Sequence, residues 1–253
     1  MSIEDHVEIK LDTLNAISAH EHKLVEAAPE KYGAYWENAE KSVMAIQTFS
    51  VKYEREALVS MFLLVAMNQY ASLALLSAAR KHAAQSALCF RFMLEAAVLS
   101  AYSLFDDQMS QLSKPGTAQS IVEKFMNLKE SKNIRKKAHA WIEESFPTHS
   151  SRIEELKTKY INKIYAHVNI PNVISAVRSA EKISGSLFFD AEDSYAIKRS
   201  MWAITDGILC SIDLVSASFA KSSKGKLDPR ALSRLYKIQQ VHLKLKTELK
   251  KGR

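Results

Sequence analysis

The longest hydrophobic stretch of the chain runs from Ala57 to Phe105, and only the polar triplet at positions 80–82 divides it into two halves. Each half is long enough for about six turns of helix. Both halves are apolar on most of their circumference instead of along one stripe, a pattern typical of helices at the centre of a bundle. The sequence therefore predicts a central apolar helix pair, at about 53–80 and 83–105, that the rest of the chain covers.

The remaining segments show apolar residues at the three- and four-residue spacing of one-sided helices. Residues that cap helix starts precede several of them, namely Ser2 with Asp5, Ser151 with Glu154, and Asp190. No Gly or Pro occurs between position 34 and the end of the central pair, so the second helix is free to continue into the pair. We expect these helices at about 4–27, from 34 onward, and at about 121–129, 134–145, 151–167, 171–185, 191–220 and 229–249.

The composition supports a helical fold. Six Gly and five Pro among 253 residues leave few tight turns, which argues against a fold of many β-strands. Hydrophobic residues make up 47% of the chain, so a sizeable core can be buried. We predict an all-α protein in which a multi-helix bundle domain spans residues 1–220, followed by a basic linker and C-terminal helix at 221–253.

The positive charge of the chain is concentrated at its end. The formal net charge is +7, whereas residues 221–253 alone carry eleven Lys or Arg and two acids. The last helix also has an apolar seam with spacings of four and three, formed by Ala231, Leu235, Ile238, His242, Leu245 and Leu249. Since this seam covers fewer than three heptads, we expect the helix to dock on its own bundle and not to form a free coiled coil.

Two basic clusters are candidate nucleic-acid-binding surfaces. Lys and Arg in such clusters bind phosphate backbones through charge and counterion release, although a charged face can also be merely solvated, and a basic tail can meet an anionic membrane surface. Tyr236 is the only aromatic residue of the tail, so the interleaved aromatics of single-strand binders are missing. The candidates are Arg230, Arg234, Lys237, Lys244 and Lys251 in the tail, with Lys132, Arg135 and Lys136 in the other cluster.

Arg91 and Glu95 are the only charges inside the second half of the central pair. Their i, i+4 spacing puts them on one face of a helix. Because their neighbours are apolar, we expect an ion pair that is at least partly buried and that either locks the bundle or forms a polar site in its core. Asp206 and Asp213 interrupt a later apolar run, and either could meet Arg91 if the two helices pack together.

His167 is the third candidate for chemistry. It is predicted at the C-terminal end of a helix, because Pro171 disfavours helical geometry at the residue before it. A protonated histidine is stabilised at such an end, which is one explanation for its presence. The other explanation is general acid–base catalysis beside Arg91 and Glu95.

These residues also carry a family resemblance. Arg-x-x-x-Glu in an apolar helix, followed by a Tyr-x-His-x-Asn-x-Pro turn at 165–171, resembles a group of uncharacterised bacterial helical proteins that are in turn similar to the HEPN superfamily of helical ribonucleases and nucleotide-binding domains. The resemblance implies a protein associated with nucleic acid, directed at RNA in bacterial defence, with Arg91, Glu95 and His167 as its catalytic candidates. The HEPN ribonuclease signature places four to six residues between its Arg and His, whereas Arg135 and His139 have three between them.

Other features narrow the setting. No His-Glu-x-x-His motif and no Gly-rich phosphate loop occur, so we expect no metal and no cofactor. Cys89 and Cys210 lie in apolar runs and are interpreted as free thiols of a reducing compartment. The first half of the central pair is long enough to span a bilayer, but Arg91 and Glu95 in the second half would be costly in lipid. We therefore expect a cytoplasmic protein with no membrane span.

Three functions are compatible with these observations. The first is a HEPN-like protein associated with nucleic acid. The second is a non-catalytic helical module for interaction or oligomerisation, with a homodimer as one form. The third is an enzyme that acts on a small phosphorylated substrate through Arg91, Glu95 and His167.

Overall fold

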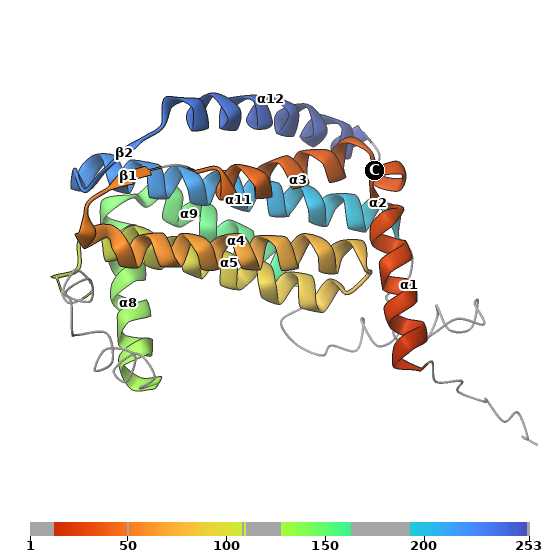
Figure 1. The fold of residues 1–253 in the computed structure, drawn as a ribbon, viewed down its shortest axis with the longest axis horizontal. Coiled ribbons are helices and arrows are strands. Elements are labelled where there is room, and N and C mark those ends of the chain that lie inside the picture. The colour runs from red at the N-terminus through yellow and green to blue at the C-terminus, as the bar shows by residue number, and fades with distance from the viewer. Residues whose placement is uncertain (1–12, 50, 108, 110–127, 163–192, 252–253) are drawn as a thin grey trace, which may run out of the picture.

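The computed structural model describes residues 13–49, 51–107, 109, 128–162 and 193–251. These residues form a bundle of helices with one short two-stranded sheet, so the predicted all-α multi-helix fold is confirmed (Figure 1). The α-helices are α1 (Leu14–Glu26), α2 (Ala28–Tyr32), α3 (Ala34–Gln47), α4 (Leu58–Ala79), α5 (Ala83–Ser103), α8 (Leu128–Ser145), α9 (Pro147–Leu156), α11 (Ser194–Ser222) and α12 (Pro229–Lys251). The shorter elements are β1 (Val51–Tyr53), β2 (Gly225–Leu227), the 3-10 helix η1 (Arg55–Ala57) and the π-helix η2 (Lys157–Asn162).

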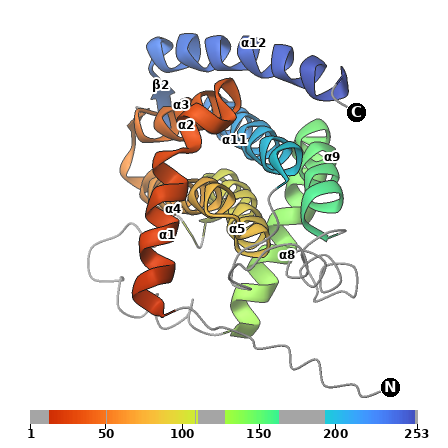
Figure 2. The same cartoon turned by 90° about the vertical axis from the view of Figure 1, so that its right-hand side faces the viewer.

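The long helices lie in three layers. Figures 1 and 2 show α12 on one side of the bundle, α3 and α11 in the middle, and α4 and α5 on the opposite side. Helix α11 packs against α3, α4, α5, α9 and α12, so it is the central element of the bundle. Helix α8 extends away from the bundle on the side opposite α12 (Figure 1).

The predicted central pair is present as α4 and α5, which pack along their length. Small buried side chains at Ala71, Ala74 and Ala97 allow the two helices to approach closely. The buried hydroxyls of Ser60 and Ser100 lie 2.8 Å apart and link the pair across the interface. The two helices have hardly any polar stripe that would fix their orientation. Close packing of small residues and hydrogen bonds between buried polar groups hold them together instead.

The prediction that the second helix runs on into the central pair is wrong. Helix α3 ends at Gln47, and β1 pairs antiparallel with β2, with Val51 opposite Leu227. The amide of Glu54 extends this contact by donating to the carbonyl of Lys224 at 2.9 Å. A partner strand far along the chain thus overrides local helix propensity, and the segment expected to be a linker after α11 supplies that strand.

Two helix starts also differ from the prediction. Pro147 occupies the first turn of α9, where proline is favoured, so Ser151 and Glu154 lie inside this helix and do not cap it. The N-cap of α11 is Asp193, whose carboxylate accepts from the amide of Ala196 at 3.0 Å. The expected caps Ser2, Asp5 and Asp190, the expected helix at 171–185 and residues 121–127 of the expected helix at 121–129 lie outside the described residues. Helix α8 begins at Leu128, so the predicted helix start at 134 is wrong.

The docking of α12 on its own bundle is confirmed. Its seam residues Ala231, Ile238 and Leu245 are buried against α3 and α11. Two hydrogen bonds reach its backbone from the bundle, because the Tyr35 hydroxyl donates to the Leu245 carbonyl and the Trp202 indole donates to a carbonyl one turn earlier, each at 3.2 Å. The apolar seam and these bonds give α12 a defined position on the surface.

Candidate functional site

The ion pair between Arg91 and Glu95 is present, but it does not lie in the bundle core. The guanidinium Nε of Arg91 donates to Glu95 at 3.1 Å, and Arg135 of α8 lies 3.7 Å from the other oxygen of the same carboxylate. The Glu95 side chain is 14% exposed, whereas that of Arg91 is 47% exposed. The pair therefore sits on the outer face of α5 beside α8. It is partly buried through Glu95, as expected, but the expected place of Arg91 in the bundle core is wrong.

Neither predicted acid meets Arg91. Asp206 pairs with Arg152 and His242, and Asp213 pairs with His149 at 2.9 Å. His167 lies outside the described residues, so its convergence with Arg91 and Glu95 stays a prediction.

The charged cluster that the structure does assemble joins three helices. Asp206 of α11 accepts one hydrogen bond from Arg152 of α9 and lies 3.2 Å from Nε2 of His242 in α12. Glu155 accepts a second bond from Arg152. Burial lowers the pKa of Arg152, but the two carboxylates outweigh that effect and raise it above its ordinary value, so the guanidinium stays charged.

His242 is nearly enclosed within this network. Its ring stacks on Trp202 with centroids 4.5 Å apart, and its Nδ1 has no hydrogen-bond partner among the described residues. Nε2 is therefore the ring nitrogen that engages Asp206. Glu155 also pairs with Lys159, so both carboxylates of the cluster are engaged by cations, and the cluster fastens α12 to α9 and α11.

A groove of about 490 Å³ runs beside this network, between α12 and the pair α9 and α11. Leu232, Tyr236 and Leu243 form an apolar wall on the α12 side, and the His149–Asp213 pair lies on the other side. Cys210 also lines the groove, and burial together with Asp206 raises the pKa of its thiol to about 12. The thiol is therefore protonated at neutral pH and is a poor nucleophile.

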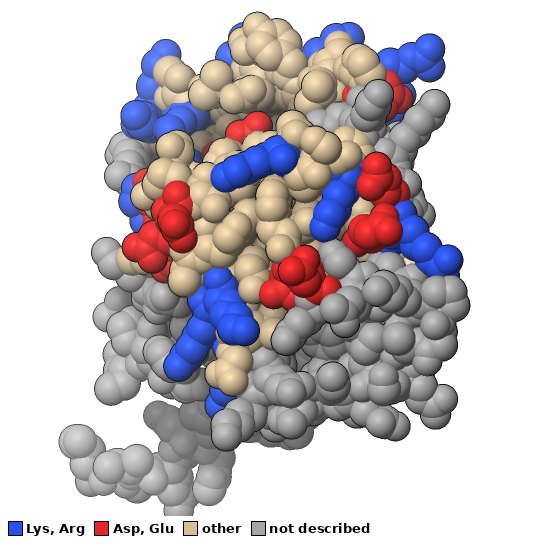
Figure 3. All heavy atoms as spheres, turned by 90° about the vertical axis from the view of Figure 1, so that its left-hand side faces the viewer, with Lys and Arg blue, Asp and Glu red and all other residues tan. Residues whose placement is uncertain are grey.

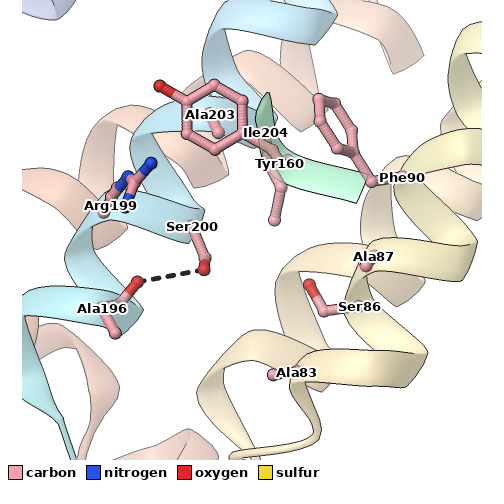
Figure 4. A pocket seen from close by; sticks show the side chains of 10 residues that line it. All are labelled: Ala83, Ser86, Ala87, Phe90, Tyr160, Ala196, Arg199, Ser200, Ala203 and Ile204. Carbon is pink, nitrogen blue, oxygen red and sulfur yellow. Dashed lines mark hydrogen bonds between the residues drawn. The ribbon is translucent and has the colours of Figure 1, made fainter. Parts of the chain in front are cut away.

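A second, smaller pocket of about 70 Å³ lies between α5, η2 and α11 (Figure 4). Arg199 is the only charged residue that lines it, and its guanidinium lies over the Tyr160 ring at 5.2 Å. The hydroxyls of Ser86 and Ser200 donate to backbone carbonyls. This pocket has room for a few water molecules but not for a nucleotide.

The predicted basic residues of α12 form a stripe on one exposed face of the helix. None of them makes an ion pair with another residue that the structure describes, and the face carries a single acid, Glu248. At a rise of about 1.5 Å per residue the stripe is roughly 30 Å long. We call it the basic stripe, and its residues are Arg230, Arg234, Lys237, Lys244 and Lys251.

The other basic cluster, on α8, is separate from this stripe. Lys132 and Lys136 are exposed, whereas Arg135 is engaged with Glu95. Figure 1 places α8 and α12 on opposite sides of the bundle. On the end face between them, Figure 3 shows positive and negative side chains interspersed, with the blue spheres of α12 along the upper edge. The two clusters therefore cannot act as one continuous surface.

Comparisons with known proteins give no family for the chain, because no family model, no curated protein and no solved structure matches it. Among the described residues, no group of three or more His, Cys, Asp or Glu could hold a metal ion.

Two helical stretches, Arg55–Ala79 and Ser194–Ser222, are long and apolar enough to cross a membrane by length and composition alone. The absence of a membrane span stays a prediction.

We call the contacts of Asp206 with Arg152 and His242 the three-helix network, and the sequence indicated it only in part. Asp206 is an acid inside an apolar run, and His242 is a polar residue inside an apolar seam. Each of these positions indicates a buried polar contact. Their pairing with Arg152 could not be predicted, because it depends on which three helices meet in the fold.

Proposed function

We propose that the protein binds nucleic acid through the basic stripe of α12. One observation carries the proposal: five exposed cations without acidic partners among the described residues share one face of a helix whose apolar seam is buried. Cations in such a row bind phosphates and release condensed counterions, and they do so without reading the base sequence.

The attachment of α12 supports this function. The apolar seam, the bonds from Tyr35 and Trp202, and the contact of His242 with Asp206 keep the helix in one position. A helix that is already fixed loses little conformational freedom when phosphates bind to it. The stripe is roughly 30 Å long, close to one helical turn of duplex DNA at about 34 Å. Its length therefore suits a continuous backbone better than a single phosphate group.

The further assignment to RNA, in a HEPN-like setting, rests on the resemblance carried by Arg91, Glu95 and His167. Helix α5 lies on the side of the bundle away from α12 (Figures 1 and 2), so a strand along the stripe does not pass Arg91. We therefore propose binding without cleavage as the function of the stripe.

The test compares three charge-neutralising double variants of the full chain with the parent protein. Arg234→Gln with Lys237→Gln removes the middle of the stripe, and Lys132→Gln with Lys136→Gln removes the α8 cluster. The matched control, Lys23→Gln with Lys41→Gln, makes the same change in net charge at exposed positions elsewhere. Affinity for labelled 20-nucleotide single strands and duplexes, of RNA and of DNA, is measured by fluorescence anisotropy.

We expect the stripe variant to bind about tenfold or more weakly and the control to bind as the parent does. Loss of binding only in the α8 variant would move the interface to the other side of the bundle. Equal weakening in all three variants would mean that net charge alone attracts the nucleic acid, and it would overturn the proposed site.

A further inference from the structure

The groove between α12 and the pair α9 and α11 is lined by two buried polar side chains whose hydrogen bonding is incomplete. His242 of α12 and Ser216 of α11 both line it, and they are 4% and 7% exposed. Neither Nδ1 of His242 nor Oγ of Ser216 has a hydrogen-bond partner among the described residues. Since buried polar atoms are nearly always hydrogen-bonded, these two indicate that a molecule in the groove completes their bonding.

The two polar side chains lie at opposite ends of the groove. Nε2 of His242 lies 3.2 Å from Asp206, which precedes Ser216 by ten residues on α11. At a rise of about 1.5 Å per residue, this separation is roughly 15 Å along the helix axis. Helix α12 runs antiparallel beside α11 (Figure 1), so its lining residues follow the same path in reverse. A molecule that reaches both ends must therefore be elongated.

The lining between the two ends is largely apolar. The groove has a volume of about 490 Å³, which is within the range of roughly 300–1,000 Å³ that is typical of small-molecule sites. An apolar body placed there would be removed from water, and this burial favours binding. The apolar lining residues are Leu209 of α11 and Leu232, Leu235, Tyr236 and Leu243 of α12.

The charged groups that line the groove are already paired with each other. Arg152 pairs with Asp206, and His149 lies 2.9 Å from Asp213. An ionised ligand would lose its hydration without gaining an unpaired charge of opposite sign, so the groove favours an uncharged one.

The two unpartnered atoms also indicate the polar group of the ligand. Nε2 of His242 is engaged by a carboxylate, so Nδ1 accepts a hydrogen bond when the ring is neutral and donates one when it is protonated. The Ser216 hydroxyl can donate and accept. A hydroxyl group on the ligand matches both of these side chains in every one of these states.

We propose that the groove binds an uncharged, elongated and largely apolar small molecule with a hydroxyl group at each end. One hydroxyl bonds Nδ1 of His242, the other bonds Ser216, and the apolar body lies between α11 and α12. The proposal is independent of nucleic-acid binding, because none of the five residues of the basic stripe lines the groove.

The test titrates the full chain, without nucleic acid, with α,ω-decanediol and follows the amide signals by NMR. This probe is uncharged, carries a hydroxyl at each end, and is comparable in length to the groove when extended. Three related probes vary one property each. The shorter α,ω-pentanediol cannot reach both ends, decanedioate is an anion of the same length, and α,ω-diaminodecane is a cation of the same length.

Two variants test the groove, and each has a matched control. Ser216→Ala removes the hydroxyl at one end, whereas Ser211→Ala removes a hydroxyl of α11 that is also buried and unpartnered but does not line the groove. Gln239→Trp fills the middle of the groove, whereas Gln240→Trp makes the same change at an exposed position outside it. Thermal melting checks the fold. Ser216→Ala should not lower the melting temperature, because its hydroxyl has no intramolecular hydrogen bond to lose.

We expect saturable shifts of the groove amides with a Kd of about 1 mM or tighter for the decanediol. Binding should be about threefold to tenfold weaker in Ser216→Ala, absent in Gln239→Trp and unchanged in both controls. The pentanediol should bind at least about tenfold more weakly, because it buries fewer methylene groups.

Four results would overturn the proposal. They are the absence of saturable shifts at decanediol concentrations up to ten times that Kd, shifts confined to the exposed apolar residues of α4 and α5, equal weakening in Ser216→Ala and Ser211→Ala, and tighter binding of either charged probe than of the decanediol.

Discussion

Helices α4 and α11 are similar in composition and differ in surroundings. Both contain an 18-residue stretch apolar enough to cross a membrane, with a mean hydropathy of 1.6 within Arg55–Ala79 and 1.4 within Ser194–Ser222. Only 33% of the α4 window is buried inside the bundle, compared with 67% of the α11 window. Hydropathy alone therefore does not tell which apolar helix a fold covers.

The difference follows from the partners of each helix. Helix α11 is enclosed by α3, α5, α9 and α12, and its acid Asp206 binds residues of two of them. Helix α4 carries no charged residue and lies at the outside of the bundle, where α5 is its main neighbour. An apolar helix with a few well-placed polar residues specifies its neighbours, whereas a uniformly apolar helix leaves a face for some other surface.

The largest effect that separates the two helices is expected from truncation of their apolar side chains. Ile208→Ala in α11 removes a side chain that is 0% exposed and should lower the free energy of unfolding by about 2–5 kcal/mol. Val65→Ala in α4, at 56% exposure, should cost about 0.5 kcal/mol or less in the monomer. Urea denaturation at a concentration where the chain is monomeric measures both. Equal losses in the free energy of unfolding would show that α4 is covered to the same extent as α11.

The next effect concerns the polar contact that places α12 over α11. Asp206→Ala leaves His242 buried without its acceptor and removes one of the two carboxylates on Arg152, so we expect a loss of about 1–3 kcal/mol. The control is Asp213→Ala, whose side chain is 76% exposed and whose removal should cost at most about 1 kcal/mol. Chemical denaturation gives both values. A control that is as costly as Asp206→Ala would contradict a special role for the three-helix network.

A smaller effect should appear in the pH dependence of stability. Burial and the nearby Lys157 ammonium lower the pKa of His139 on α8 in the folded protein. The unfolded chain, with a histidine pKa of about 6.5, then binds more protons over the interval between the two pKa values. Stability should therefore be intact above pH 6.5 and decline as the pH falls from there toward the folded pKa. Denaturation of His139→Gln between pH 7.5 and 5 should show a shallower decline, and an unchanged decline would contradict this assignment.

The smallest effect is expected at the exposed ion pair on the outer face of α5. Arg91→Ala should cost less than about 1 kcal/mol, because Arg91 is 47% exposed and Arg135 still faces Glu95. Glu95→Ala leaves two arginines without their shared carboxylate and provides the comparison. A drop of several kcal/mol on loss of Arg91 would place this side chain in a buried setting that the structure does not show.

The helical fold was predictable because its pattern is local. Long uninterrupted apolar runs indicate α4, α5 and α11, and the seam of α12 indicates a docked helix. The pairing of β1 with β2 was not predictable, since two three-residue strands far apart in the chain carry almost no periodic signal. Helix α9 begins at Pro147 and not at the predicted 151, because proline fits the first turn of a helix.

The environment of Arg91 shows why the burial of a side chain was harder to predict than the positions of the helices. Its apolar neighbour Phe92 suggested a buried setting, but Phe92 is itself 38% exposed on the uncovered face of α5. Apolar neighbours indicate burial only where another element covers them, and the sequence does not show which elements do. The basic stripe was predictable because helical spacing alone places its residues on one face.

The most direct test of the proposed function is the salt dependence of nucleic-acid binding by the full chain. For duplex DNA, five phosphate contacts predict a slope of log affinity against log salt of about −4 to −5 between 50 and 200 mM. Neutralising Arg234 and Lys237 should reduce the magnitude of this slope by about 2, and the Lys23 and Lys41 control should leave it unchanged. No binding at 50 mM salt, or the same slope in the stripe variant, would contradict the assignment of α12 as a nucleic-acid-binding helix.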